Sequence, residues 1–190
     1  MTEQLGPDVS GYRIRKLWPM EASAFRRHLL RLDPETRQQR FGSAVNDGFL
    51  EAYAGTTDRL GTVVYGAFDD HDMHASAELR PLHLPGKSAA EAAFTVERSC
   101  QHLGLGSLLM DRIITAAQNR RISQLYMICM RDNSTMQHLA GKFGARLRID
   151  HGEVTGQIEP AYPTPVSLFD EQMNDAAGFV TAVLDWRLAV

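Results

Sequence analysis

The sequence predicts a single domain of the α/β (α+β) class, in which one mixed β-sheet is flanked by helices. Segments of alternating apolar and polar residues, typical of strands, intersperse with segments whose apolar residues recur at helical spacing. The length of 190 residues is that of one ordinary domain. With 44% hydrophobic and 23% charged residues, the chain has a globular composition, which excludes disorder and fibrous repeats.

The first third of the chain is expected to hold one strand and three helices. Residues 11–17 alternate like a strand, and after Pro19 the positions Ala24, Phe25, His28, Leu29 and Leu32 recur at helical spacing. A second helix is predicted to begin at Asp33 and Pro34, since an aspartate cap followed by proline is typical of a first turn. A third is expected between Asn46 and Gly55.

The middle of the chain alternates between strands and a long helix. Residues 61–68 and 75–82 predict an antiparallel hairpin with an acidic tip. A strand at about 89–96 then leads through a loop into a helix over 104–119, whose apolar residues share one side. Residues 124–130 are apolar throughout, as expected of a strand buried on both faces beside a parallel neighbour.

The end of the chain predicts a helix over 133–142, a last hairpin at 145–158 and a further helix. That helix is expected at about 167–187, with Phe179, Val183 and Trp186 on the side that packs against the rest of the protein. We therefore expect a domain over residues 11–158 and a C-terminal extension over residues 159–190.

Charge and cysteine content limit the possible partners and compartments. The formal net charge of -3 supplies no positive field for a nucleic-acid backbone, so no nucleic-acid partner is expected. No uncharged apolar stretch approaches ~20 residues and the first residues lack a signal core, so no membrane association is expected. With Cys100 and Cys129 as its two cysteines, the chain is expected in the reducing cytoplasm.

The strongest functional signal is the turn between the predicted strand at 89–96 and the long helix. The first N–H groups of a helix lack intrahelical partners and lie at the positive end of its dipole, which suits an anion. Gly104 and Gly106 would let the backbone approach that anion closely. Leu109 and Ser107 do not fit the dinucleotide and triphosphate fingerprints. By themselves, two glycines before a helix are more often an ordinary tight turn.

Two linked motifs resemble those of a known family. The segment QHLGLG at 101–106 resembles the acyl-CoA-binding motif of the GNAT family of N-acyltransferases. The segment NSTMQHLAGKFG at 133–144 resembles that family's next signature beside the cofactor. The segment AEAAFTV at 90–96 is similar to the cofactor-side strand of the branch that includes bacterial protein-lysine acetyltransferases. The resemblance covers about residues 11–158.

The resemblance implies a GNAT-like twisted mixed sheet whose central parallel strands, at 89–96 and 123–130, splay apart. Acetyl-CoA would enter there as co-substrate, with its pantetheine arm acting as a surrogate strand. The implied cofactor-binding residues are Phe94, Thr95 and Val96 for the arm and thioester carbonyl, Gln101, His102, Leu103, Gly104, Leu105, Gly106 and Ser107 for the pyrophosphate, and Asn133 for the opposite side of the arm.

Acyl transfer from a thioester to an amine requires a base for the amine, a polarised carbonyl and a protonated leaving thiolate. The resemblance places Glu91 as the general base. Burial among apolar neighbours would raise the pKa of its carboxylate toward the working pH, which suits that role. The alternative interpretation is a solvated carboxylate at a strand edge. Glu78 is a rival base, for which a charge on the surface of the hairpin is the simpler interpretation. A main-chain N–H near Phe94 or Val96 would form the oxyanion hole.

The proton donor for the thiolate is not assigned. Ala140 stands where many family members carry a tyrosine as general acid. A covalent cysteine intermediate is not expected, because neither cysteine has a motif-linked histidine and Cys129 lies in an apolar strand. No metal site is expected either, because His71, Asp72 and His74 are best interpreted as a solvated turn. Arg40 either lines an acceptor cleft or belongs to a wet helix face.

The sequence therefore predicts an acetyl-CoA-dependent N-acetyltransferase, acting by direct attack of an amine, with Glu91 as base. A protein lysine or a small amine is the expected acceptor. The alternative is a non-catalytic acyl-CoA-binding sensor. The sequence does not indicate an oligomeric state.

Overall fold

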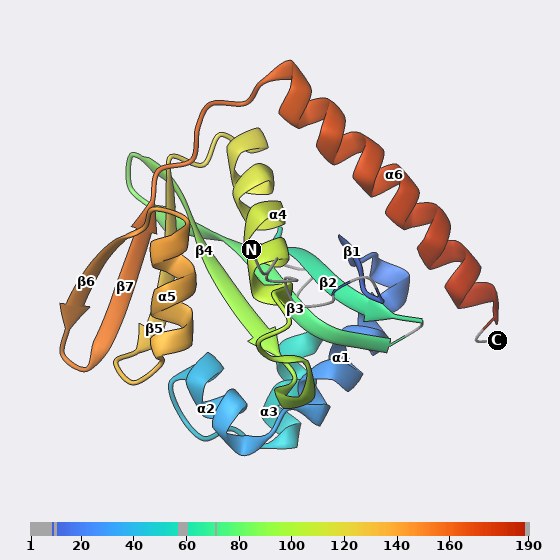
Figure 1. Cartoon of the computed structure of the whole chain (residues 1–190), viewed down its shortest axis with the longest axis horizontal. Coiled ribbons are helices and arrows are strands. Elements are labelled where there is room, and N and C mark those ends of the chain that lie inside the picture. The colour runs from blue at the N-terminus through green and yellow to red at the C-terminus, as the bar shows by residue number, and fades with distance from the viewer. Residues whose placement is uncertain (1–8, 10, 57–60, 71, 189–190) are drawn as a thin grey trace, which may run out of the picture.

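The computed structural model describes residues 9, 11–56, 61–70 and 72–188, without the side chains of 186–188. Its centre is a seven-stranded sheet in the order β1-β2-β3-β4-β5-β7-β6 (Figure 1). The strands are β1 (Arg13–Lys16), β2 (Val63–Asp69), β3 (Asp72–Leu84), β4 (Lys87–Val96), β5 (Gln124–Met130), β6 (Arg146–Asp150) and β7 (Glu153–Ile158). The helices are α1 (Ala22–Arg31), α2 (Pro34–Phe41), α3 (Asp47–Ala54), α4 (Leu105–Asn119), α5 (Ser134–Lys142) and α6 (Pro165–Leu188), with short 3-10 turns η1 (Pro19–Glu21) and η3 (Arg98–Cys100).

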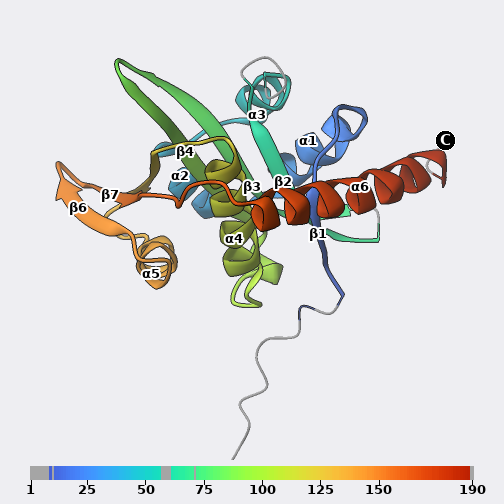
Figure 2. The same ribbon diagram turned by 90° about the horizontal axis from the view of Figure 1, so that it is seen from above.

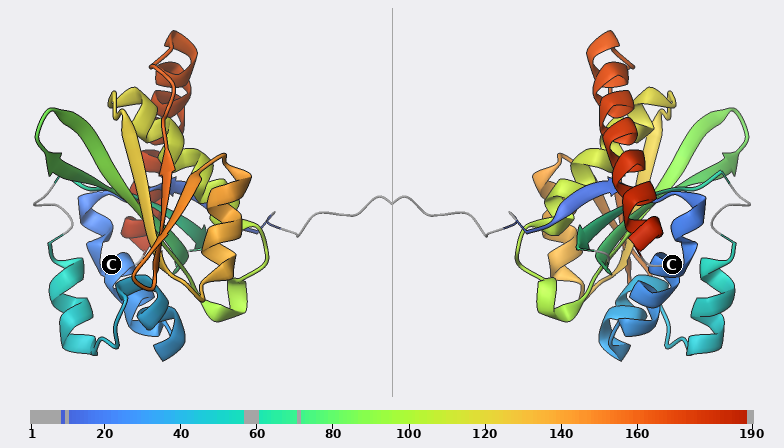
Figure 3. Two further views of the ribbon diagram at one scale, coloured as in Figure 1. Left: turned by 90° about the vertical axis from the view of Figure 1, so that its left-hand side faces the viewer. Right: turned by 90° about the vertical axis from the view of Figure 1, so that its right-hand side faces the viewer.

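Helices cover both faces of the sheet, so the core has two parts (Figure 3). On one face, α1 and α3 bury Phe25, Leu29 and Leu50 against Phe68 of β2. On the other, the apolar side of α4 packs on the alanine-rich centres of β3 and β4. The small alanine side chains let a helix lie close to the sheet. The mixed fold predicted from the sequence is therefore confirmed.

Short-range signals account for the helix ends. The Asp33 carboxylate accepts the N–H groups of Glu35 and Thr36, both at 3.1 Å, and so caps α2. Asn46 caps α3 in the same way, accepting the N–H of Phe49 at 2.9 Å. The three predicted N-terminal helices all form, and α2 and α3 begin where these two caps indicate.

The β3–β4 hairpin is longer than the sequence predicts. The two strands pair continuously from Ala75 with Val96 to Leu84 with Lys87, through a turn in which Gly86 has a φ of 70°. The sequence predicts that the first of these strands ends near residue 82 and that the second begins near residue 89. Both predicted strand ends at the hairpin turn are therefore wrong. Proline at position 81 and polar residues beyond it mask the strand signal.

The central strands β4 and β5 part after a short contact. Among the described strands they are the parallel neighbours, and they pair at three positions, from Ala89 with Gln124 to Glu91 with Tyr126. Beyond Glu91 they diverge, which leaves one edge of β4 from Ala92 to Val96 without a strand partner (Figure 1). The expected splay is confirmed.

The C-terminal helix α6 lies along the outside of the protein beside β1 (Figure 2). It begins at Pro165, two residues earlier than predicted, and contacts β1, η1 and α4. The close approach of α6 to β1 depends on Gly178, because a Cβ there would lie 3.1 Å from the Cβ of Arg15. The ring of Phe179 packs edge-on against Trp18, while the Trp186 side chain is outside the described residues. Over the described ranges, none of the helices combines the length and apolar composition that crossing a bilayer requires.

Arg15 of β1 forms the buried ion pairs that join β1 to η1 and α6. Its buried guanidinium pairs with Glu21 at 2.7 Å and with Asp185 of α6 at 3.2 Å. We expect Arg15→Leu to lower the free energy of unfolding by roughly 3 kcal/mol, because the buried Glu21 is left uncompensated.

Urea denaturation of the full chain measures this loss. The matched control is Arg27→Leu, since Arg27 is half exposed and pairs only loosely with Asp72, at 3.7 Å. Equal losses in the two variants would show that the Arg15 pair contributes no more than a surface contact.

Candidate active site

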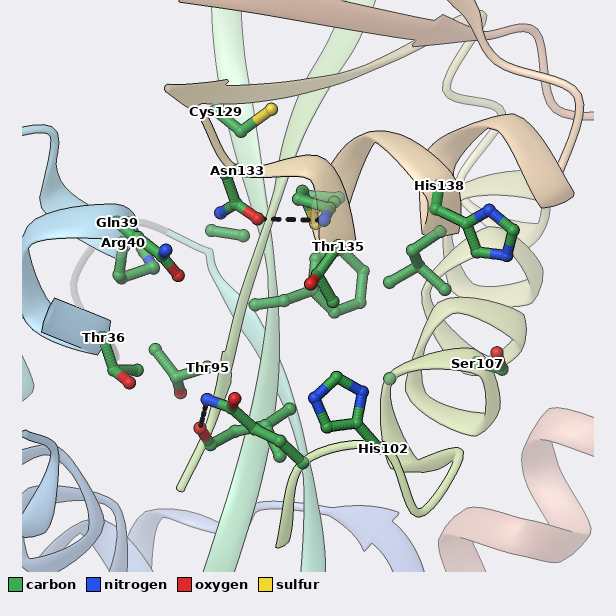
Figure 4. Close-up of a pocket in the computed structure, with 18 of the residues that line it drawn as sticks. Thr36, Gln39, Arg40, Thr95, His102, Ser107, Cys129, Asn133, Thr135 and His138 are labelled. Carbon is green, nitrogen blue, oxygen red and sulfur yellow. Dashed lines mark hydrogen bonds between the residues drawn. The ribbon is translucent and has the colours of Figure 1, made fainter. Parts of the chain in front are cut away.

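A cavity of about 320 Å³ opens where β4 and β5 part. Its walls come from β4, β5, α2, α5 and the start of α4 (Figure 4). The predicted site residues that line it are Glu91, Phe94, Thr95, Val96, Gln101, His102, Gly104, Gly106, Ser107 and Asn133. Leu103 and Leu105 do not line it, because both pack into the core beneath α4. The fold thus gathers residues more than 40 positions apart into one space.

The turn before α4 has the backbone geometry of an anion-binding corner. His102 and Gly104 both have positive φ, 63° and 88°, which turns successive N–H groups toward the start of α4. At Gly106 a Cβ would lie 3.4 Å from Leu139, so α5 approaches this helix turn closely. Gln101 is tied back to β4, because its Nε2 donates to the carbonyl of Val96 at 3.2 Å. These features fit the diphosphate of a nucleotide-containing cofactor.

Lys142 is a cation at this corner that sequence reasoning did not select. Its Nζ donates to the Oγ of Ser107 at 3.1 Å, and both residues line the cavity. The exposed ammonium therefore sits beside the first turn of α4, where it would face a bound phosphate. The sequence shows that Lys142 belongs to the second motif, at 133–144. It does not show that Lys142 lies within hydrogen-bond distance of Ser107.

Glu91 lies on β4 at the last position paired with β5. It is half-buried, lines the cavity and stands opposite Arg80 of β3 in the sheet register. Asn133 lines the same cavity from the start of α5, beyond the far end of β5. The Oδ1 of Asn133 caps that helix by accepting the N–H of Met136 at 2.9 Å, and its amide nitrogen is turned toward the cavity (Figure 4). A carboxylate near the point where the strands separate and an amide beyond the end of β5 thus line one cavity.

Glu78 is buried, so its interpretation as a surface charge of the hairpin is wrong. Its carboxylate accepts hydrogen bonds from Arg40 at 2.8 Å and from the Tyr53 hydroxyl at 2.9 Å, and Arg80 lies at 3.4 Å. Only 1% of the residue is exposed. The oxygens of Glu78 are thus occupied by donors from α2, α3 and β3.

Arg40 contacts Glu78 and also lines the cavity. The interpretation of Arg40 as part of a solvent-exposed helix face is therefore wrong. Burial by itself lowers the pKa of Arg40, but the combined influence of Glu78, Tyr53 and Glu91 outweighs that effect and raises the pKa, so the guanidinium stays charged. Arg40 also bonds the Tyr53 hydroxyl and lines the cavity together with Thr36 and Gln39. The α2 wall of the cavity is therefore polar and held in place by a buried ion pair.

A second buried chain of hydrogen bonds holds the end of β4. The fully buried His28 of α1 bonds Glu97 through Nδ1 at 3.0 Å and the hydroxyl of Thr95 through Nε2 at 2.8 Å. A carboxylate can only accept, so Nδ1 carries the proton and the Thr95 hydroxyl donates to Nε2. Ser76 lies 2.6 Å from the same Thr95 oxygen. This chain fixes the strand edge that faces the cavity.

Sequence reasoning placed His28 on the core side of its helix and gave Glu97 no role. Burial alone raises the pKa of Glu97, but hydrogen bonds from His28, His74 and Arg31 outweigh burial and lower it to about 2. Burial lowers the pKa of His28, an effect larger than the opposing influence of Glu97. A histidine within an otherwise apolar helix face was the available signal.

Two other predicted features can be placed. Cys129 is buried as expected, and it also lines the cavity. Within the described part of the chain, no cluster of three or more His, Cys, Asp or Glu side chains is arranged to hold a metal. His71, weighed above as a ligand, lies outside the described residues.

Comparison with known proteins defines the class. Residues 22–145, well over half of the chain, match the model of the acetyltransferase (GNAT) family. The chain therefore belongs to the GNAT family and is an acetyl-CoA-dependent N-acetyltransferase.

Solved structures share the fold at low sequence identity. The GNAT domain of PAT from S. lividans has a TM-score of 0.67 at 18% identity, with 78% of this chain and 90% of that one covered. A putative acetyltransferase, yncA, from Salmonella typhimurium, solved with acetyl-CoA, has a TM-score of 0.61 at 14% identity, covering 81% and 96%. Ribosomal-protein-alanine N-acetyltransferase from Brucella melitensis has a TM-score of 0.62 at 15% identity, covering 77% and 99%.

The buried His28 makes stability depend on pH in a defined direction. Because its pKa is lowered in the folded protein, the unfolded chain binds a proton that the folded chain does not, below about pH 6.5. The free energy of unfolding should therefore fall on acidification from about pH 7 to 5, by up to about 1.4 kcal/mol per pH unit. Protonation of Glu97 lowers the free energy of unfolding further, but only at lower pH, as the pH falls toward the folded pKa of Glu97 of about 2.

Denaturation at a series of pH values tests this with two variants. We expect His28→Gln to be less stable at neutral pH and to show a shallower fall, whereas His83→Gln, at an exposed position, should parallel the wild type. Parallel curves for all three proteins would rule out His28 as the titrating group.

Proposed function

We propose that this protein acetylates a primary amine by direct attack on acetyl-CoA, with Glu91 as general base. The observation that carries the proposal is the placement of a half-buried carboxylate at the point where β4 and β5 part, inside the cavity. The yncA structure was solved with acetyl-CoA, which supports the same ligand in the matching fold here.

The residues of this chain fit the cofactor. The unpaired edge of β4 from Phe94 to Val96 offers main-chain groups to the pantetheine arm, and Asn133 offers its amide from the other side. The N–H groups from His102 to Gly106 would bind the diphosphate, with Lys142 adding one positive charge, whereas the N–H of Ser107 donates to the carbonyl of Gly104 at 3.0 Å. Gly104, with its positive φ of 88°, and Gly106 carry no Cβ, which lets the backbone come close to phosphate oxygens.

The chemical step needs one base and one oxyanion donor from the protein. Glu91 removes a proton from the ammonium, directly or through water, and the neutral nitrogen attacks the thioester carbonyl. A β4 N–H near Phe94 or Val96 stabilises the oxyanion. The carbon–sulfur bond then breaks, the second proton of the nitrogen passes through water to the departing thiolate, and Glu91 returns the first proton to solvent. Since a thiol has a reference pKa near 8.5, the thiolate leaves without a protein acid, which suits the alanine at position 140.

A protein lysine is the acceptor we propose, with a small amine as the alternative. The Brucella structure is named for a protein substrate, and the resemblance of residues 90–96 points to the lysine-modifying branch. At the mouth of the cavity, Ile128 is about half exposed and offers an apolar surface to an alkyl chain. We place the reaction in the cytoplasm, consistent with two free thiols.

Glu91→Gln separates the enzyme from a non-catalytic sensor. Loss of a general base costs typically 10²–10⁴-fold, so kcat should fall by about that factor. Thermal stabilisation by CoA should be unchanged, because binding uses other residues. The rate is followed as free thiol released in the presence of an amine panel.

Glu78→Gln is not a clean control, since it breaks a buried ion pair, so Glu153→Gln on an exposed strand end serves instead. A Glu91→Gln enzyme with normal turnover would exclude this residue as base. A wild-type protein that binds CoA but releases thiol with no amine would favour the sensor.

Lys142→Met should weaken CoA binding by roughly tenfold at low salt, the range of one charge-assisted contact, and by less as salt increases. Calorimetry with CoA measures the change. Binding of an acetyl-pantetheine that lacks the diphosphate should be unaffected. Lys87→Met, at the exposed tip of the β3–β4 hairpin, is the matched control. Equal weakening of both ligands would mean that Lys142 supports the fold of the cavity rather than the phosphates.

A further inference from the structure

The helix α6 carries an exposed apolar stripe along its outer side. Val166, Phe169, Met173, Val180 and Leu184 are each more than half exposed. At 100° per residue these five positions fall within one narrow arc of the helix, on the side opposite Glu171, Asp175 and Ala182. We call these five residues the α6 stripe. It spans roughly 27 Å, since each helical residue rises about 1.5 Å.

The contacts of α6 within the protein use its other side. There, Ala182 and Gly178 are buried, Asp175 pairs with Lys16 at 2.9 Å, and Glu171 pairs with Arg120 at 2.7 Å. The right-hand view of Figure 3 shows the outer side of α6 facing away from the sheet. A row of exposed apolar side chains on one side of a helix is typical of a surface that binds a partner.

We propose that the α6 stripe is a dimer interface, in which α6 packs antiparallel against α6 of a second copy of this chain. A two-fold axis at the level of residue 175 pairs Val166 with Leu184 and Phe169 with Val180. It also brings Met173 opposite the exposed Ala177 of the second copy. A larger side chain meets a smaller one at the centre of the contact, as close helix packing requires.

The distribution of charge favours a second copy. Three of the four acidic residues of α6, Glu171, Asp175 and Asp185, bond to cations of their own chain. The fourth, Asp170, flanks the stripe and would lie near Thr181 of the second copy rather than near another carboxylate. The stripe therefore pairs with itself without like-charge repulsion.

The same charges disfavour a membrane surface as the occupant. Residues 165–188 contain four acidic residues and one arginine. Helices that lie on anionic membranes instead carry lysine and arginine beside the apolar side.

Dimerisation through α6 leaves the active site open. The cavity is lined by α2, α5, β4, β5 and the start of α4, whereas α6 contacts β1, η1 and the side of α4. The proposal is thus independent of the proposed function, and each can fail without the other.

Sedimentation velocity of the full chain over a wide concentration range is the first test. We expect a monomer–dimer equilibrium that Met173→Glu and Val180→Glu each shift to monomer. Because both side chains are exposed, the variants should keep their circular dichroism and their stabilisation by CoA. Ile149→Glu, at an equally exposed apolar position on β6, should dimerise like the wild type. A wild-type monomer at every concentration, or a dimer unaffected by both stripe variants, would overturn the proposal.

Cross-linking tests the antiparallel direction. Val166→Cys and Leu184→Cys, mixed and oxidised, should form a disulfide between the two different chains, and the native Cys100 and Cys129 are buried. A cross-link in Val166→Cys alone would overturn the antiparallel arrangement. A chain that stays monomeric but sediments with phosphatidylserine vesicles would overturn the dimer and identify a membrane as the occupant instead.

Discussion

Interruption of the β4–β5 ladder is the constraint on which the rest of the structure depends. A strand in the middle of a sheet normally satisfies its backbone groups on both edges, and an unpaired buried group costs free energy. After Glu91, β4 loses its neighbour on one side. The Val96 carbonyl accepts a hydrogen bond from Gln101, and the remaining main-chain groups on this edge are left for water or for an extended ligand with amides of its own.

An opened strand keeps its shape only if its other contacts are strong. Along its intact edge, β4 pairs with β3 over ten positions. At its far end, Thr95 and Glu97 are tied to α1 through His28, which is fully buried. These contacts hold the cavity edge in a fixed geometry before any ligand arrives, which reduces the ordering cost of binding.

Two carboxylates on the same face of the sheet have different chemistry because their surroundings differ. Glu78 is enclosed by Arg40, Tyr53 and Arg80, so it serves as the counter-ion that keeps the α2 wall in place. Glu91, thirteen residues on and half-buried, lines the open cavity. The geometry of the splay, rather than residue type, distinguishes a carboxylate enclosed by cations from one that lines an open cavity.

The sequence by itself determined the order of the elements, the caps at Asp33 and Asn46, and the glycine corner before α4, because those signals act within a few residues. It did not show that Glu78 is buried, that His28 bonds Thr95 and Glu97, or that Lys142 reaches Ser107. Each of these contacts joins residues about 25 to 70 positions apart, so it exists only once the sheet brings distant helices together. Likewise, the apolar residues of α6 were readable, but which of them face outward depends on how β1 and Gly178 orient the helix, and only the tertiary structure decides that.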